Sequence, residues 1–378
     1  MTNDLRATCP FCSLHCADLR LSIDEGRLTR LSPQCEFGMR NYTWVLRSIA
    51  VGDEYSIPTN QFTQALTILE SARRLLVVLS ADVPDVAVEG ALRIVRKYHG
   101  VLSVEDETLN NLNISMKEVG GFSATLGELK EVEMVFICGA EPKHSHPRLA
   151  EFLSRCAIDN SLIISPLESF ETIRQLRLVL ADETPEVPQK YRKTMDAMRS
   201  ASTGVIFVDS SFLQAGEPTA RELLLWLRDL NRCGRWYGQY LPIGANSVVV
   251  AETLLSTGGI AGGLFSGEDF EEISPRCWKT SKLINDGWMD ACLFVGNPST
   301  LVENFAIRLQ GVNTILIDPI QPSWKPAVWL PVTQVGVDAA GSMARLDGVP
   351  LLLEQFVESG RPTIQTLLVG LLEGRVPS

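Results

Sequence analysis

The sequence of 378 residues lacks several features that would point to common functions. No apolar run approaches the roughly 20 residues that a transmembrane helix needs, and the first residues lack the basic segment and apolar run of a secretory signal. We therefore expect a cytoplasmic protein that does not bind a membrane. A net charge of −11 disfavours nucleic acid as a partner. Only four histidines are present, which limits any histidine-based metal site, and we find no Ser/His/Asp arrangement typical of hydrolases.

Disulfides are not expected either, because the cytoplasm keeps thiols reduced. Of the nine cysteines, four crowd the first tenth of the chain and five are scattered singly, mostly beside apolar residues. We predict that the five single cysteines are small buried hydrophobes. They are Cys138, Cys156, Cys233, Cys277 and Cys292.

The four crowded cysteines form the most specific chemical pattern in the sequence. Cys9, Cys12 and Cys16 lie within eight residues, and Cys35 follows farther along the chain. Three local thiolates closed by a distant fourth are suited to an iron–sulfur cluster, whereas zinc usually takes two local pairs. The pattern favours a 4Fe-4S cluster and leaves open a zinc ion or an empty, vestigial site. His15 lies inside this loop, and we expect a surface residue rather than a ligand.

Beyond residue 56, short apolar runs that end in Gly, Asp, Ser or Pro alternate with stretches of helix length. Buried β-branched runs followed by amphipathic stretches predict an α/β fold with parallel sheets. The expected strands are 75–80, 132–139, 161–166, 204–210, 291–297 and 313–319. The expected helices are 84–98, 147–157, 218–231 and 300–310.

Linker composition divides the chain into four predicted parts. They are a Cys-rich iron–sulfur-type domain at 1–56, a first α/β domain at 57–185, a second α/β domain at 186–334 and a C-terminal segment at 335–378. In parallel sheets, ligands bind beyond the carboxyl ends of the strands. We therefore expect any ligand site in the loops that follow the predicted strands.

The cysteine loop begins a resemblance that extends through nearly the whole chain. Residues 9–18, CPFCSLHCAD, resemble the cluster-binding start of molybdopterin oxidoreductases and, more narrowly, of the B subunit of formylmethanofuran dehydrogenase. Three further segments carry the narrower match: EVG at 118–120 with ATLGE at 124–128, the segment 139–148, and GVDAAGS at 336–342 with RLDGVP at 345–350. The resemblance implies a molybdopterin-oxidoreductase-like fold, in which Rossmann-like domains with parallel sheets follow a small N-terminal iron–sulfur domain.

In the family that it resembles, the B subunit holds a tungsten or molybdenum ion on two pterin-dinucleotide cofactors. A cysteine ligates the metal, and a neighbouring histidine assists in carbon dioxide reduction. The resemblance places this pair shortly before the EVG segment, near Thr108 and Leu109. No cysteine stands between residues 35 and 138, and no histidine between residues 99 and 144. The expected metal ligand is therefore missing.

A hydroxyl is a poor substitute for this ligand, because it lacks the softness and the low proton affinity of a thiolate. Some members of the superfamily use serine or aspartate as the ligand. Asp106 or Thr108 is therefore left as an alternative ligand.

The positions that would hold the pterin cofactors are mostly altered. Their phosphates need backbone amides, helix N-termini or arginines, yet the glycine-rich loop 258–263 is followed by four carboxylates within 268–272, which repel phosphates. Glu141 also replaces the asparagine of the family motif, whereas Gly296 and Asn297 keep the family pattern. His146 is either a pocket-lining residue or an exposed loop histidine. We regard Gly296, Asn297 and His146 as vestigial pocket positions and expect no tungsto- or molybdopterin.

Loss of the ligand pair resembles the bacterial formyltransferase/hydrolase complex, a relative of formylmethanofuran dehydrogenase in tetrahydromethanopterin-linked one-carbon metabolism. The resemblance implies a structural B subunit with no catalytic residue of its own and with formyltransferase, hydrolase and C-type subunits as partners. Two alternatives stay open. One is an active tungsten or molybdenum subunit that reduces carbon dioxide or oxidises formylmethanofuran, and the other is an iron–sulfur electron-transfer module.

Overall fold

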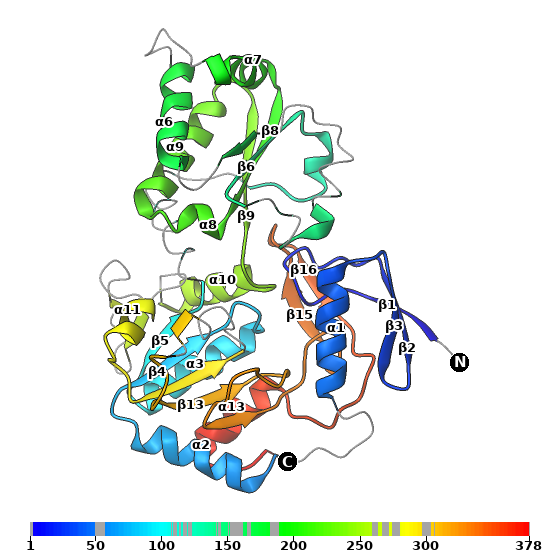
Figure 1. Cartoon of the computed structure of the whole chain (residues 1–378), viewed down its shortest axis with the longest axis vertical. Helices are drawn as coiled ribbons and strands as arrows, with labels where there is room; N and C mark the ends of the chain where they lie inside the picture. The colour runs from blue at the N-terminus through cyan, green and yellow to red at the C-terminus, as the bar shows by residue number, and fades with distance from the viewer. Residues whose placement is uncertain are drawn as a thin grey trace. The chain divides into compact units, whose positions relative to one another are not determined.

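The chain forms two compact units, which are Met1–Glu107 with Gly244–Arg345 and Pro350–Ser378 (unit 1), and Thr108–Ile243 with Leu346–Val349 (unit 2) (Figure 1). The computed structural model describes residues 3–49, 57–106, 123–140, 162–164, 168–181, 189–258, 264–266, 272–273, 280–296 and 307–377, together with 108, 112, 115, 119, 142, 145–149, 151 and 304–305.

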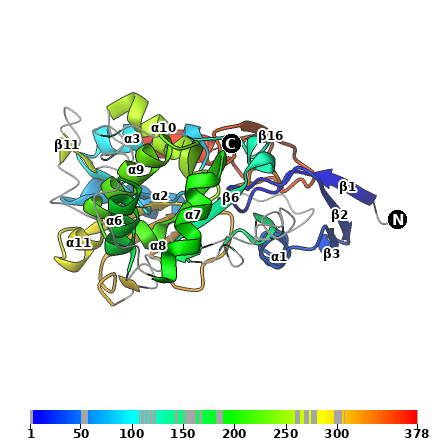
Figure 2. The ribbon, with the colours of Figure 1, turned by 90° about the horizontal axis from the view of Figure 1, so that it is seen from above.

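Unit 1 begins with a small N-terminal module in which one helix packs against an antiparallel sheet. The sheet has the order β1-β2-β3, and both views place α1 beside the β2–β3 hairpin (Figures 1 and 2). Alternate residues of β2 such as Leu19 and Leu21 pack against Tyr42 and Val45 of α1, which gives the module its own core. The elements are β1 (Asn3–Ala7), β2 (Leu19–Asp24), β3 (Arg27–Ser32) and α1 (Glu36–Ser48).

The main sheet of unit 1 has the order β11-β10-β5-β4-β12-β13-β14 in the described residues. The strands from β5 to β14 are parallel, and β10 and β11 extend the sheet antiparallel to β5. The strands are β4 (Leu75–Leu79), β5 (Val101–Val104), β10 (Leu264–Ser266), β11 (Glu272–Ile273), β12 (Ala291–Val295), β13 (Asn313–Ile317) and β14 (Val328–Leu330).

Helices cover both faces of this sheet, which explains why its strands are apolar throughout rather than alternating. Leu75, Val77 and Leu79 of β4 pack with α2, α3 and α13, whereas Leu76 and Val78 pack on the opposite face with α11. The remaining elements of unit 1 are α2 (Thr59–Ser71), α3 (Asp85–Lys97), α10 (Ser247–Gly258), α11 (Thr280–Asn285), α13 (Ile364–Glu373) and the hairpin β15 (Gly341–Ala344) and β16 (Pro350–Leu353).

Unit 2 is built on a parallel sheet with the order β7-β6-β8-β9. Phe136, Trp226 and Trp236 form the aromatic centre of its core, with the ring of Phe136 4.9 Å and 5.8 Å from the two indoles. The elements are η1 (Glu128–Glu131), β6 (Met134–Cys138), β7 (Leu162–Ile164), α6 (Ser169–Leu180), η2 (Gln189–Tyr191), α7 (Arg192–Ser200), β8 (Thr203–Asp209), α8 (Ser210–Leu213), α9 (Glu217–Leu230) and β9 (Arg235–Leu241).

All six strands expected from apolar runs are present, as β4, β6, β7, β8, β12 and β13, and they lie in parallel sheets as predicted. The helices expected at 84–98 and 218–231 are α3 and α9, whereas those at 147–157 and 300–310 lie largely outside the described residues. Among the described helices, none combines the length and the apolar character that crossing a bilayer requires.

The two units do not follow the domain boundaries expected at residues 185 and 334. Residues 291–295 of β12 pair in register with residues 75–79 of β4, so two segments assigned to different domains share one sheet. The sequence pattern identifies individual strands, but it carries no information on which distant strand lies beside them.

The single cysteines only partly match the prediction. Cys138 and Cys292 are buried in strands, as expected, but Cys233 is exposed. It lies in the turn after α9, where the chain reverses at the surface. Cys156 and Cys277 lie outside the described residues.

Candidate functional site

The four N-terminal cysteines belong to one module of unit 1. The loop between β1 and β2 carries Cys9, Cys12 and Cys16, and a backbone bond from Cys9 N to Cys16 O, 3.0 Å long, closes it. Cys35 is the N-cap of α1, where its Sγ accepts a hydrogen bond from Gly38 N at 3.4 Å. Cys9 and Cys12 are buried, and Cys16 and Cys35 are half-buried.

The buried thiols hold their protons in the metal-free protein. Burial, followed by the neighbouring thiol of Cys16, raises the pKa of Cys12 to about 12. Burial and the thiol of Cys12 raise the pKa of Cys9 well above its usual value. A metal that bound here would therefore have to displace protons, since only thiolates are effective ligands.

The number and kind of the side chains bear on which metal site the cysteines suit. Among the described residues, no group of three His, Cys, Asp or Glu side chains is placed to hold a metal ion, which gives a zinc site no support. An iron–sulfur cluster takes four thiolates, each of which binds a different iron. The number and chemistry of the four thiols fit such a cluster, and the N–H bond to Cys35 is of the kind that tunes cluster thiolates.

His15 is buried, and the expectation of a surface residue is wrong. Its side chain is 1% exposed, and its Nδ1 and Nε2 each lie 2.8 Å from a carbonyl oxygen, of Cys9 and Ala245 respectively. Burial lowers the pKa of His15, so the neutral ring has one N–H and donates to one of the two carbonyls, but both ring nitrogens face backbone oxygens of unit 1. The imidazole connects the cysteine loop to the segment that leads into α10.

The position of the missing metal ligand holds no thiol in either unit. Thr108 is buried in unit 2, and its Oγ1 lies 3.0 Å from the phenol oxygen of Tyr240. Asp106 is 1% exposed at the end of β5 in unit 1. Leu109 lies outside the described residues. A threonine that already has a hydrogen-bond partner is a poorer metal ligand than an unengaged one, which weakens the Thr108 alternative.

Carboxyl groups gather at the carboxyl edge of the parallel sheet in unit 1. Asp82 follows β4 and is exposed, Glu105 follows β5 and is half-buried, and Asp318 follows β13 and is 4% exposed. Asp82 accepts a hydrogen bond from Ala245 N at 2.5 Å, and Glu105 accepts one from Ser80 Oγ at 3.1 Å. The sequence contained part of the signal for this cluster, because Asp82 and Asp318 follow or end predicted strands, whereas the strand before Glu105 was not predicted.

Crowding at this edge favours protonated carboxyl groups. Burial, together with the charge of Asp82, raises the pKa of both Glu105 and Asp318 to about 8. The guanidinium of Arg361, which donates to Pro319 O at 2.7 Å, opposes the shift at Asp318. Phosphates bind where backbone amides or arginines face them. This edge presents acids, so it does not fit the pyrophosphate of a pterin dinucleotide.

Two of the three vestigial pocket positions are described, and each belongs to a different unit. Gly296 directly follows β12 in unit 1 and has a φ of +80°, and a Cβ there would meet Ser80 Cβ at 2.6 Å. The backbone conformation and the packing thus require glycine without any cofactor. His146 belongs to unit 2 and is 2% exposed, so the reading as an exposed loop histidine is wrong. Burial lowers the pKa of His146 to about 4, which keeps the ring neutral. Asn297 and Glu141 lie outside the described residues.

Known proteins of similar sequence and fold were found by comparison, although no family model matches the chain. The B subunit of the tungsten-containing formylmethanofuran dehydrogenase 2 of Methanocaldococcus jannaschii is 21% identical over 415 aligned positions, which cover 93% of this chain and 93% of that protein. A chain in the crystal structure of the formyltransferase/hydrolase complex (FhcABCD) from Methylorubrum extorquens with methylofuran superposes with a TM-score of 0.69. The match is 16% identical and covers 84% of this chain and 95% of that chain. The chain is therefore similar along almost its whole length to the B subunit of a formylmethanofuran dehydrogenase, as its sequence motifs predict, and it shares its α/β fold with a chain of the formyltransferase/hydrolase complex.

Proposed function

We propose that this chain is the B subunit of a cytoplasmic formyltransferase/hydrolase-type complex of methanofuran-linked one-carbon metabolism. In this role it is a structural subunit without a redox site of its own. Its partners are formyltransferase, hydrolase and C-type subunits. Similarity to the B subunit of a formylmethanofuran dehydrogenase over nearly the whole chain supports the complex, and the missing ligand pair supports the structural role.

The observation that carries the structural role is the coordination chemistry at residues 106–109. The segment offers no thiol, and the hydroxyl of Thr108 is engaged by Tyr240. A tungsten or molybdenum ion prefers a soft, anionic ligand, which the neutral hydroxyl of a threonine does not supply. The carboxyl edge of the sheet in unit 1 adds a second argument, because three carboxyl groups gather there, whereas the phosphates of pterin cofactors are anchored by backbone amides, helix N-termini or arginines.

Metal analysis of the purified complex tests this role. The expected result is less than stoichiometric tungsten and molybdenum in the anaerobically purified complex, together with no reduction of carbon dioxide by a reduced electron donor. The complex should still transfer and hydrolyse formyl groups through its other subunits. One tungsten or molybdenum ion per chain, with turnover, would establish the active redox subunit instead.

A second candidate function is an iron–sulfur electron-transfer module, which the four cysteines of the N-terminal module favour. The expected result is about four iron and four sulfide per chain, and a paramagnetic signal after reduction. Cys12→Ala should abolish the signal, because a buried member of the local triad is lost. Cys233→Ala is the matched control, since this exposed cysteine lies in unit 2, and it should leave the signal intact. A colourless protein without iron would leave only the vestigial site.

A further inference from the structure

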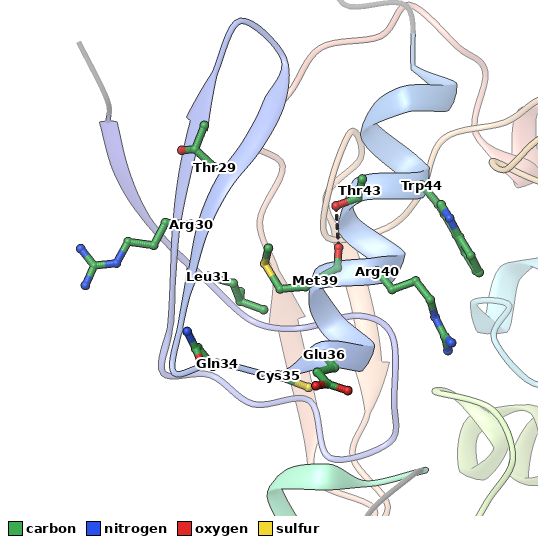
Figure 3. Close-up of a pocket in the computed structure, with 10 residues that line it drawn as sticks. All are labelled: Thr29, Arg30, Leu31, Gln34, Cys35, Glu36, Met39, Arg40, Thr43 and Trp44. Atoms are coloured by element: carbon green, nitrogen blue, oxygen red, sulfur yellow. Dashed lines mark hydrogen bonds between the residues drawn. The ribbon is translucent and has the colours of Figure 1, made fainter.

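A groove of about 530 Å³ lies along α1 of the N-terminal module (Figure 3). Leu31 of β3 and Met39 of α1 point toward one another and make it apolar, whereas Arg40 and Trp44 project from the opposite side of the helix (Figure 3). The side chain of Trp44 is 46% exposed, which is unusual for so large an apolar surface. Aromatic and arginine side chains of this kind are enriched where proteins bind one another.

Both threonine hydroxyl groups that line the groove already donate hydrogen bonds to backbone carbonyls. Thr43 Oγ1 donates to Met39 O at 2.7 Å (Figure 3), and Thr29 Oγ1 donates to Ser22 O at 2.9 Å. The polar groups that remain for an occupant include the Arg40 and Arg30 guanidinium groups, the Gln34 amide and the Glu36 carboxylate. The first of these is a strong donor for carboxylates.

The guanidinium of Arg40 is held in place by two aromatic rings. Its Cζ lies 5.3 Å from the ring centroid of Phe37 and 5.2 Å from that of Trp44. Stacking restricts the guanidinium before any partner binds, which lowers the entropy cost of binding. No ion pair joins it to a carboxylate of the described residues.

The surface around the groove is basic in an otherwise acidic protein. Residues 27–47, which form β3 and α1, contain one carboxylate, Glu36, and four exposed arginines, whereas the whole chain has a net charge of −11. The arginines are Arg27, Arg30, Arg40 and Arg47, and none forms an ion pair with a described carboxylate. Charge complementarity therefore favours an acidic partner.

We propose that the groove between α1 and β3 is the docking site for an acidic segment of a partner protein, which inserts an apolar side chain beside Leu31 and Met39. This proposal rests on the proposed function, since the partner is another subunit of the complex. A protein fits better than a nucleic acid or an anionic membrane, because the net charge of the chain repels extended polyanions. The apolar floor also requires an occupant that carries an apolar side chain.

Charge reversal in the intact complex tests the proposal. Arg40→Glu should reduce the recovery of one partner subunit with the affinity-tagged chain by roughly tenfold or more, because a close charge pair becomes repulsive. Arg93→Glu makes the same charge change on an exposed part of α3 and is the matched control. Thermal unfolding of the tagged chain should be alike for both variants. Cys35 also lines the groove and is left unchanged, so cluster binding is not disturbed.

Photo-crosslinking identifies the occupant. With p-benzoylphenylalanine replacing Gln34, the expected product joins this chain to a peptide of one partner subunit that is rich in Asp and Glu. A crosslink to a second copy of this chain, to nucleic acid or to nothing would overturn the proposal, as would full recovery of all subunits with Arg40→Glu. If the wild-type chain itself recovers no subunit, the proposed function fails as well, whereas failure of the groove alone leaves the wild-type complex intact.

Discussion

Gly204 leaves room for the indole ring of Trp236 in the core of unit 2. A Cβ at this position would lie 2.3 Å from Cζ3 of Trp236, and the ring is fully buried. We expect Gly204→Ala to lower the free energy of unfolding by about 1–3 kcal/mol, because overpacking displaces a side chain that has no room to move. Urea denaturation followed by fluorescence measures the change.

Gly127→Ala is the control for this substitution. Gly127 also lies in unit 2, has φ −66° and faces only Thr125 Oγ1, at 3.7 Å. Its replacement should change the free energy of unfolding by less than about 0.5 kcal/mol. Equal losses in the two variants would contradict the packing argument at Gly204.

Single residues also mark the limit of what the sequence predicts about the site. The spacing of the cysteines could be read from the sequence because it is a local property, whereas the metal that they would bind stays a prediction. The burial of His15 was missed, since its partner Ala245 lies 230 residues away. The burial of His146 was left open for the same reason, because the sequence around a loop does not reveal what covers it.

At the scale of helices, Arg177 of α6 forms ion pairs with two carboxylates of α9. Arg177 of α6 binds Glu222 Oε1 at 2.6 Å and Asp229 Oδ2 at 2.9 Å, and the three side chains are 11–21% exposed. Arg177→Met should lower the free energy of unfolding on the order of 1–2 kcal/mol, since two charge-assisted hydrogen bonds are lost. The loss should shrink as salt screens the pair.

Arg228→Met is the matched control for the helix pair. Arg228 is 50% exposed and lies 3.6 Å from Asp229 Oδ1, so its removal should cost less than about 0.5 kcal/mol. Denaturation curves of the two variants at low and high salt make the comparison. A loss at Arg228 as large as that at Arg177 would mean that partial burial does not strengthen the pair.

The carboxyl edge of the sheet in unit 1 predicts a loss of stability in alkali. The pKa of Asp318 rises from 3.8 to about 8 on folding, so the folded state binds more protons than the unfolded chain between these values. The contribution of Asp318 to the free energy of unfolding is therefore full below about pH 4, and it is lost as the pH rises toward 8. Between pH 6 and pH 9 the free energy of unfolding should fall less in Asp318→Asn than in the unsubstituted protein, by about 2 kcal/mol.

Denaturation at a series of pH values tests this sign. Glu105 contributes in the same direction, but it is half-buried, so solvent screens part of its shift and Asp318 is the sharper probe. Glu89→Gln removes an exposed carboxylate from α3 in the same unit and serves as the control. A stability that rises with pH between 6 and 9 would contradict the prediction.

Strands were more predictable than the sheets that they form. A buried parallel strand is a continuous apolar run, and six such runs could be identified from the sequence. The short strand β5 and the antiparallel strands β1, β2 and β3 were missed, since Leu28, Thr29 and Arg30 of β3 carry no such run. The order of the strands in each sheet could not be predicted, because it depends on contacts between distant segments.

At the scale of the molecule, composition predicted the kind of partner only in part. A net charge of −11 disfavours nucleic acid as the main partner, yet it conceals the four exposed arginines of residues 27–47. An average over the chain hides a local surface of opposite sign. Similarity along the whole chain to the B subunit of a formylmethanofuran dehydrogenase then supports the proposed complex, which neither charge nor fold identifies by itself.

The discontinuous course of the chain has a consequence for its synthesis. Strands β4 and β5 leave the ribosome long before β12 and β13, with which they share a sheet, whereas the strands of unit 2 follow one another from residue 134 to residue 241. Translation therefore delivers most of the inserted unit while the early strands still lack their neighbours. Until those arrive, the nascent chain exposes apolar edges, and a chaperone that shields residues 75–104 would raise the yield of folded protein.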